Sequence, residues 1–152
     1  MVALVRLQIP VRVYITSELT SQEELLAFAK RFGIVVIQLG DVHSIEKNHI
    51  KMIEERFNKV HLYMGGPPCQ KTASVNTGNT DRTPTKEFAQ FVTILKWFKS
   101  APFVLVETLA SSGHKETVDL MFEPFEQFGC TKKVIDAKLV SPLRRCRSYF
   151  TN

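Results

Sequence analysis

The sequence predicts an α/β fold, in which helices cover both faces of a mostly parallel sheet as a three-layer α/β/α sandwich. Three observations support this prediction. The chain has 152 residues, the size of one compact domain. Hydrophobic residues make up 44% of it and charged residues 23%, a composition typical of a globular protein with a core. Short apolar runs alternate with segments of helical periodicity, and this alternation is typical of parallel sheets.

Each expected element follows from its local pattern. Residues 11–16 alternate apolar and polar side chains, as a strand with one buried face does. Ser21 and Glu24 have the spacing of a capping box and open a helix that Gly33 ends. Residues 34–37 are a continuous run of β-branched side chains, which predicts a strand covered on both faces. The remaining strands are expected at residues 60–64, 103–107, 134–137 and 146–150, and the remaining helices at residues 45–57, 85–99 and 115–128.

Functional residues are expected where these strands end. In parallel α/β sheets, ligands bind beyond the carboxyl ends of the strands. Glu18 follows the first expected strand, and Asp41 follows the second. Residues 65–70 follow the third strand, and Glu107 ends the fourth. This coincidence predicts an enzyme-type cleft at that edge of the sheet.

Charge is distributed unevenly along the chain. Residues 131–152 hold six of the 20 basic residues and, in Asp136, only one of the 15 acidic ones. That end therefore carries the whole net charge of +5, while the rest of the chain is neutral. A basic end on a neutral body is what a phosphate-facing edge would look like, and a solvated basic tail is equally compatible with it.

Cysteine and hydrophobic patterns exclude several classes of protein. Cys69, Cys130 and Cys146 are an odd number without a CxxC pair, which argues against a disulfide framework or a zinc site and favours a reducing compartment. The four histidines have no metal-ligand spacing, so no metal is expected. No apolar run approaches the roughly 20 residues that cross a bilayer, and no secretory signal is evident at the start.

The segment Gly65-Gly66-Pro67-Pro68-Cys69-Gln70 has the strongest chemical signature in the sequence. Two glycines allow a sharp turn after a buried strand, and two prolines restrict the backbone that follows. A cysteine on such a rigid loop at a cleft is placed as a nucleophile. An isolated cysteine is more often a small buried apolar residue, but this surrounding segment favours the nucleophile.

These residues resemble the Pro-Cys nucleophile motif of the cytosine-5 DNA methyltransferases. Three further segments are similar to motifs of that family in the same order, and together they resemble the animal de novo branch over nearly the whole chain. They are Thr-Ser-Glu-Leu at residues 16–19, Gly-Asp-Val at residues 40–42, and residues 134–152 with the Arg-x-Arg motif at Arg145 and Arg147.

The resemblance implies an S-adenosylmethionine-dependent methyltransferase fold of the Rossmann-like type and transfer of a methyl group to cytosine C5 in DNA. Cys69 would add to C6 of a flipped cytosine, and Glu107 would act as general acid near N3. Arg145 and Arg147 would hold the base and its phosphates. The residues implied to bind S-adenosylmethionine are Glu18, Asp41, Val42 and Pro68.

The resemblance also implies partners and a location. DNA is the implied substrate, another methyltransferase subunit is an implied partner, and the nucleus is the implied compartment. No membrane association is expected. Two alternatives remain open, namely a catalytically inactive paralogue that regulates an active methyltransferase and a transfer-RNA cytosine methyltransferase. Residues 141–150, SPLRRCRSYF, favour the DNA enzyme over the latter.

The sequence departs from the family in three places. No glycine precedes Gly33, so the family's cofactor loop is not found. The family's Glu-Asn-Val motif is Glu107-Thr108-Leu109 here, and the target-recognition region is not found before Asn152. Residues 1–152 are therefore expected to be a partial catalytic domain, incomplete at both ends. Such a chain alone is expected to bind S-adenosylmethionine weakly and to be inactive.

Overall fold

The computed structural model describes residues 1–20, 22–67, 84–109, 115–136 and 146–152. Two compact units make up the chain, Met1–Ile45 and Glu46–Asn152, and each has its own sheet.

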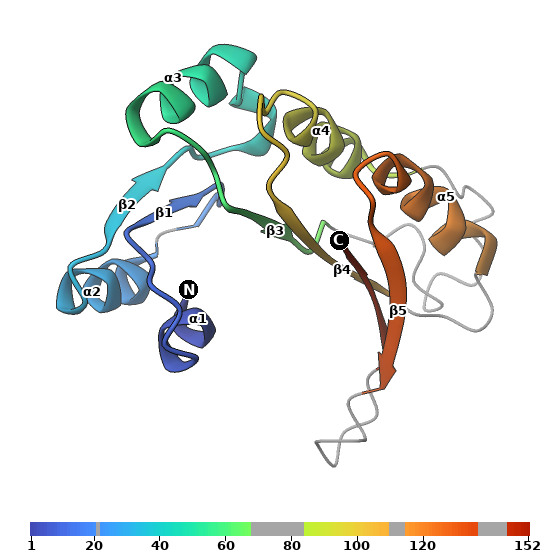
Figure 1. The fold of residues 1–152 in the computed structure, drawn as a ribbon, viewed down its shortest axis with the longest axis horizontal. Coiled ribbons are helices and arrows are strands. Elements are labelled where there is room, and N and C mark those ends of the chain that lie inside the picture. The colour runs from blue at the N-terminus through green and yellow to red at the C-terminus, as the bar shows by residue number, and fades with distance from the viewer. Residues whose placement is uncertain (21, 68–83, 110–114, 137–145) are drawn as a thin grey trace. The chain divides into compact units, whose positions relative to one another are not determined.

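The first unit is built around a parallel pair of strands (Figure 1). Strand β1 (Val13–Thr16) leads into helix α2 (Glu23–Arg31), which returns the chain to strand β2 (Val35–Gln38). Val13 lies opposite Val35, and Thr16 lies opposite Gln38. Because the strands are parallel, both carboxyl ends lie at the same edge. The unit also contains helix α1 (Val2–Arg6) and the short 3-10 helix η1 (Val42–Ser44).

The boundaries of α2 confirm part of the prediction from sequence. Gly33, with a φ of +65°, follows the helix, a backbone conformation that glycine adopts at little cost. Ser21 of the expected capping box lies outside the described residues. The expectation that β2 is covered on both faces is wrong for the described chain, because Val35 is 49% exposed. In the two-stranded sheet β2 is an edge strand with β1 as its one neighbour.

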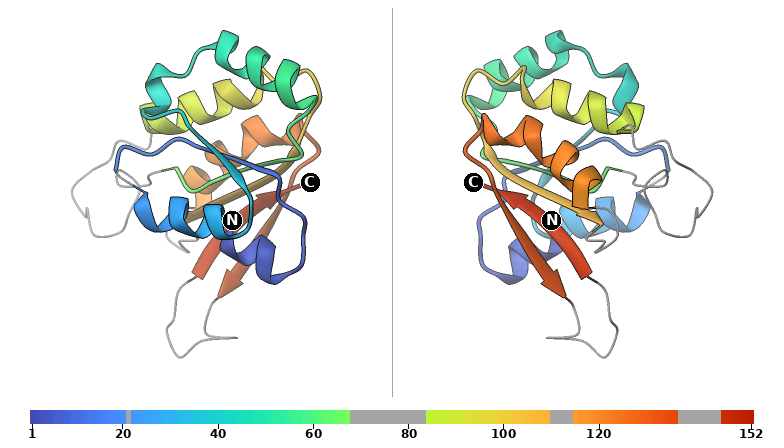
Figure 2. Two further views of the ribbon diagram at one scale, coloured as in Figure 1. Left: turned by 90° about the vertical axis from the view of Figure 1, so that its left-hand side faces the viewer. Right: turned by 90° about the vertical axis from the view of Figure 1, so that its right-hand side faces the viewer.

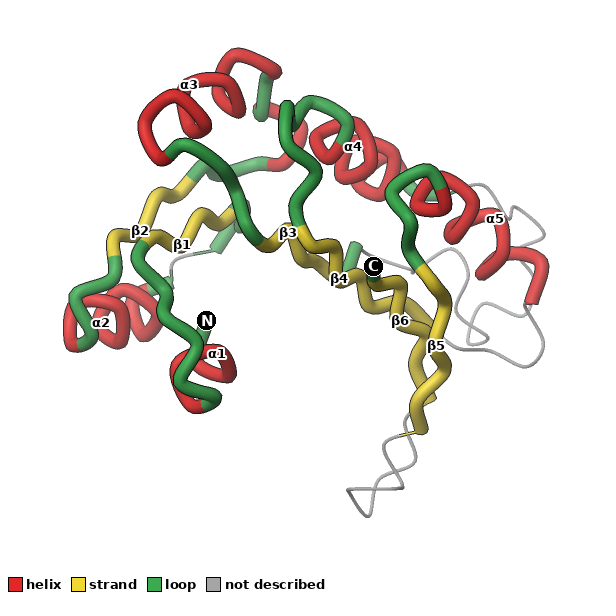
Figure 3. Tube along the Cα trace, in the orientation of Figure 1, coloured by secondary structure: helices red, strands yellow, loops and turns green. Residues whose placement is uncertain are grey.

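The second unit contains a four-stranded sheet with the order β3-β4-β6-β5 (Figure 3). Strands β3 and β4 are parallel, whereas β6 runs antiparallel to both of its neighbours, β4 and β5. The strands are β3 (Leu62–Gly65), β4 (Phe103–Leu109), β5 (Thr131–Asp136) and β6 (Cys146–Thr151), and the helices are α3 (Lys47–Phe57), α4 (Lys86–Leu95) and α5 (Lys115–Glu126).

Strand β6 is the exception in this sheet, because β3, β4 and β5 all run in one direction, so the expectation of a mostly parallel sheet is confirmed for the described strands. A parallel return requires a crossover of about a dozen residues or more. Residues 137–145, which join β5 to β6, are fewer than that. The short connection therefore accounts for the antiparallel pairing of β6 with β5.

Helices α4 and α5 lie along one face of this sheet (Figure 2) and enclose the core of the unit. Phe125 of α5 and Phe150 of β6 are fully buried, and their ring centroids lie 5.6 Å apart. Phe88 of α4 packs edge-on against Phe125 at 6.0 Å. The helix expected at residues 85–99 therefore contributes to the core of this unit. On the opposite face of the sheet, Phe103 is 69% exposed.

Pro124 lies inside α5 rather than ending it at once. The helix continues to Glu126 and stops two residues short of the expected end. Proline removes one backbone donor and crowds the preceding turn, so its place in the last turn of α5 is where it disturbs the helix least. In the part of the chain that the structure describes, no helix is both long and apolar enough to cross a membrane.

Candidate active site

The first unit has a pocket at the carboxyl ends of β1 and β2. Its volume is about 470 Å³, and Glu18 contributes a carboxylate to its lining. The lining includes one carboxylate residue, two amide residues and three leucines. The lining residues are Thr16, Glu18, Leu19, Thr20, Gln22, Leu26, Gln38, Leu39 and Gly40. This is the edge at which the sequence predicted a ligand.

Two hydrogen bonds tie the walls of this pocket together. The backbone N–H of Leu39 donates to the carbonyl of Thr16 at 2.8 Å, and the Ser17 hydroxyl donates to the carbonyl of Gly40 at 2.7 Å. Gly40 has a φ of +71°, a conformation that suits glycine. The segment after β1 that carries Glu18 is therefore fixed to the turn after β2.

Asp41 and Val42 follow this turn directly. The Asp41 carboxylate accepts a hydrogen bond from the backbone N–H of His43 at 2.9 Å and so caps η1, which begins at Val42. A capping carboxylate is held in one orientation by the backbone. The pKa of the Tyr14 hydroxyl is raised, first because the group is partly buried and secondly because of the negative charge of Glu18.

The second unit brings Glu107 and Arg147 together. Arg147 Nε donates to Glu107 Oε1 at 2.9 Å, from β6 to β4. Arg147 Nη1 also donates to the carbonyl of Cys146 at 2.8 Å. The Glu107 and Arg147 side chains are 39% and 21% exposed, so the ion pair is reachable from solvent. A carboxylate and a guanidinium held in this way can bind a polar planar ligand through fixed hydrogen bonds.

Gly66 lies against this ion pair. A Cβ atom added to Gly66 would lie 3.6 Å from Glu107 Oε2. The beginning of the glycine-proline segment therefore runs past the carboxylate of Glu107, which lies inside β4, because the strand continues to Leu109 instead of ending at Glu107 as expected. Pro67, the next residue, is buried.

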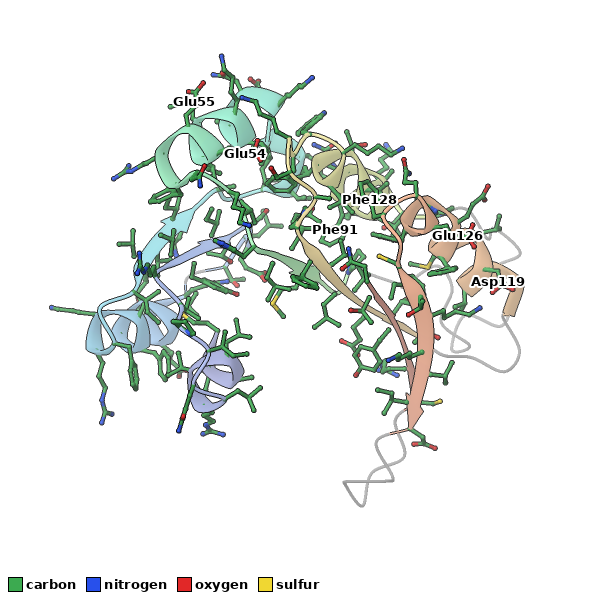
Figure 4. All side chains as sticks on the ribbon, in the orientation of Figure 1. Glu54, Glu55, Phe91, Asp119, Glu126 and Phe128 are labelled. Atoms are coloured by element: carbon green, nitrogen blue, oxygen red, sulfur yellow. The ribbon has the colours of Figure 1, made fainter. Side chains whose placement is uncertain are left out.

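The preceding glycine, Gly65, is fixed by an aromatic contact. Phe91 of α4 lies between the helix and the sheet (Figure 4), and its Cε2 would lie 2.5 Å from a Cβ on Gly65. The backbone carbonyl of Phe91 accepts a hydrogen bond from the Tyr63 hydroxyl at 2.9 Å, and the two ring centroids are 4.5 Å apart. Burial raises the pKa of the Tyr63 hydroxyl strongly, so this group stays protonated and continues to donate.

Gly65→Ala is expected to destabilise the protein by about 2 kcal/mol, because added atoms in a packed core force neighbours out of their rotamers. Gly66→Ala is the matched control, since its methyl group would meet Glu107 at an ordinary contact distance. Urea unfolding of both variants measures the difference. Equal losses of unfolding free energy would show that the Phe91 contact does not select glycine at position 65.

Thr108 occupies the place where the resembled motif has asparagine. It is 3% exposed, and its Oγ1 lies 3.7 Å from the Met121 sulfur on α5. A hydroxyl–thioether contact is a weak hydrogen bond. Thr108 therefore belongs to the core between β4 and α5.

The structure places five of the predicted site residues. Glu18, Asp41 and Val42 gather at one edge of the first unit, while Glu107 and Arg147 form an ion pair in the second. The other three predicted residues, Pro68, Cys69 and Arg145, lie outside the described residues.

Sequence reasoning missed several contributors to these sites. Ser17 bonds Gly40, while Gln22 and Gln38 line the pocket. The position of Ser17 next to Glu18 at a strand end was an available signal. No local sequence pattern indicated that Gln22 and Gln38 would line the pocket. Among the described residues, no group of three side chains is arranged to hold a metal ion.

The two sites and the strands that carry them define a protein with the methyltransferase fold. Residues 12–151 match the sequence profile of the family described as C-5 cytosine-specific DNA methylase, and the chain belongs to this family. No curated protein sequence matches the chain.

Solved structures show the same fold. The chain is similar to the Dnmt2 methyltransferase of S. pombe, with a TM-score of 0.66, 13% identity, and coverage of 98% of this chain and 44% of that one. The methyltransferase EhMeth of Entamoeba histolytica gives a TM-score of 0.57 and 18% identity, covering 93% of this chain and 43% of that one. A mutant of the DNMT2 protein of Spodoptera frugiperda gives a TM-score of 0.58 and 17% identity, covering 90% of this chain and 41% of that one. The chain thus spans less than half the length of these methyltransferases.

Proposed function

We propose that this chain carries the catalytic and cofactor-binding residues of a DNA (cytosine-5-)-methyltransferase of the de novo type. The observation that carries the proposal is the Glu107–Arg147 ion pair beside Gly66, at the start of the segment that contains Cys69. An acid, a cation and a nucleophile-bearing segment at one place are what attack on a cytosine ring requires. Membership of the cytosine-specific methylase family supports this choice of substrate base.

The pocket of the first unit fits S-adenosylmethionine in chemical terms. Its carboxylate, Glu18, can accept hydrogen bonds from the two hydroxyls of a ribose, and Leu19, Leu26 and Leu39 offer apolar surface to a purine. Asp41 and Val42 would contact the adenine beyond Gly40, and the motif resemblance alone supports Pro68 as a further cofactor-binding residue. When bound, S-adenosylmethionine supplies an electrophilic methyl group.

The residues of the chain would then activate the base. The Cys69 thiolate forms a bond to C6, which moves an electron pair toward C5 and makes that carbon nucleophilic. Glu107 holds a proton at N3, where negative charge would otherwise develop. Arg147 orients Glu107, and Arg145 and Arg147 bind the ring oxygen and adjacent phosphates. Once C5 has accepted the methyl group, water takes the C5 proton, the bond between Cys69 and C6 breaks with its electrons returning to the thiolate, and the N3 proton returns to Glu107. No metal takes part in this scheme.

A covalent trap tests this proposal. The full-length protein is incubated with S-adenosylmethionine and duplex DNA that contains 5-fluorocytosine, and complexes that survive denaturation are separated by size. Fluorine cannot leave as a proton does, so the Cys69 adduct is expected to accumulate after methyl transfer. Absence of a complex under conditions in which the DNA is bound would contradict the proposal.

A second candidate is a non-catalytic methyltransferase paralogue that regulates an active enzyme. Thr108 favours it, because a buried threonine against Met121 replaces the asparagine of the resembled motif. Under either candidate we propose DNA and a second methyltransferase subunit as partners, action in DNA methylation and epigenetic regulation, and location in the nucleus. The inactive paralogue predicts DNA or subunit binding without the trapped adduct.

A further inference from the structure

We propose that Lys133 on β5 binds a backbone phosphate of the DNA strand whose cytosine enters the site. This inference rests on the proposed function, since it assigns a substrate contact to the same site. Lys133 belongs to none of the motifs discussed above. Its assignment comes from the register of three strands.

Glu107, Tyr149 and Lys133 form one row across the sheet. Glu107 of β4 lies directly opposite Tyr149 of β6, and Tyr149 lies directly opposite Lys133 of β5. Residues directly opposite each other in antiparallel strands project from the same face. Neighbouring strands are about 4.8 Å apart, so the backbones at Glu107 and Lys133 are separated by about 10 Å. A lysine is thus presented beside the Glu107–Arg147 pair on the same face of the sheet.

The neighbouring lysine, Lys132, is already used within the fold. Its ammonium group pairs with Asp119 of α5 (Figure 4) and lies 5.9 Å from the centre of the Phe122 ring. Successive residues of a strand point to opposite faces. Lys132 therefore faces α5, and Lys133 projects from the face opposite this helix.

Among the described residues, Lys133 differs from the other cations of this hairpin because it has no counter-ion. Arg147 pairs with Glu107, and Lys132 pairs with Asp119. Lys133 is exposed, and none of the described residues forms an ion pair with it. A hydrated ammonium group without a carboxylate partner suits a phosphate, which it can bind from several directions. Tyr149 lies between Lys133 and Glu107 and offers a ring to the sugar or base of the same strand.

The salt dependence of DNA binding tests this assignment. The full chain, Lys133→Gln and Lys132→Gln are titrated with a fluorescein-labelled duplex that contains one target cytosine, over a series of salt concentrations. Both variants lose one positive charge in adjacent positions, so long-range electrostatics change equally. For Lys133→Gln we expect several-fold weaker binding at low salt and a log–log salt slope reduced by about 0.9, as for one lost phosphate contact. Lys132→Gln is expected to keep the slope of the unmodified chain, and thermal unfolding verifies that both variants are folded.

Equal slopes for the two variants, or an unchanged slope for Lys133→Gln, would overturn the assignment. The covalent trap with 5-fluorocytosine DNA separates this result from the proposed function. If the adduct forms but the Lys133 slope does not change, the phosphate contact is wrong and the methyltransferase proposal stands. If the slope changes as expected but no adduct forms, the phosphate contact stands and the catalytic proposal falls.

Discussion

Cys69→Ser is expected to abolish the covalent complex with 5-fluorocytosine DNA completely. A serine hydroxyl is far less ionised than a thiol at neutral pH, so it cannot supply the nucleophile that adds to C6. DNA binding should persist, since phosphate contacts do not need the thiol. Denaturing electrophoresis of the protein–DNA mixture measures the complex, and filter binding measures the DNA bound without a covalent bond.

The other two cysteines provide matched controls. Cys130 is buried in the core of the second unit, where burial raises the pKa of its thiol. Cys146 is partly buried at the start of β6. Cys130→Ser and Cys146→Ser should keep the adduct. A complex that survives Cys69→Ser but disappears in one of the control variants would show that the nucleophile is Cys130 or Cys146 and not Cys69.

Glu107→Gln is expected to slow methyl transfer by about 10²- to 10⁴-fold, the usual contribution of a general acid. Glutamine has nearly the same size as glutamate, but it cannot deliver the proton to N3 and carries no charge for Arg147. Because the Glu107 side chain is partly exposed, the loss of this ion pair should change the free energy of unfolding by about 1 kcal/mol or less. Glu107→Gln should therefore lower the rate of methyl transfer without unfolding the protein.

Single-turnover methyl transfer at saturating DNA separates the chemical step from binding. Glu126→Gln is the control, because Glu126 is exposed at the end of α5 (Figure 4) and lies far along the chain from either site. It should react at the rate of the unmodified protein. A Glu107→Gln rate within about twofold of that value would exclude Glu107 as the acid.

Local patterns accounted for most of the secondary structure. The alternation in residues 11–16 corresponds to β1 (Val13–Thr16), and the helix expected before Gly33 is α2 (Glu23–Arg31). Such elements follow from periodicity and capping, which involve residues close together in the chain. The position of β6 between β4 and β5 could not be obtained in this way, because it depends on the pairing of β6 with β4, a strand that lies far earlier in the sequence.

The same difference between local patterns and long-range contacts applies to the candidate site. Glu107 and Arg147 were predicted individually from their motifs, but their hydrogen bond exists because β6 pairs with β4 in the observed register. The contacts of Ser17 with Gly40 and of Phe91 with Gly65 also join distant segments. The roles of Pro68, Cys69 and Arg145 stay predictions from the sequence.

Methyl transfer by the full-length protein to DNA and to transfer RNA tests the central proposal most directly. Each nucleic acid is incubated with tritiated S-adenosylmethionine, digested to nucleosides and separated, so that the modified nucleoside is identified as well as counted. The DNA methyltransferase proposed here predicts label in 5-methyl-2′-deoxycytidine and its loss in Cys69→Ser. Label in 5-methylcytidine of transfer RNA alone, or no label in either nucleic acid, would contradict it.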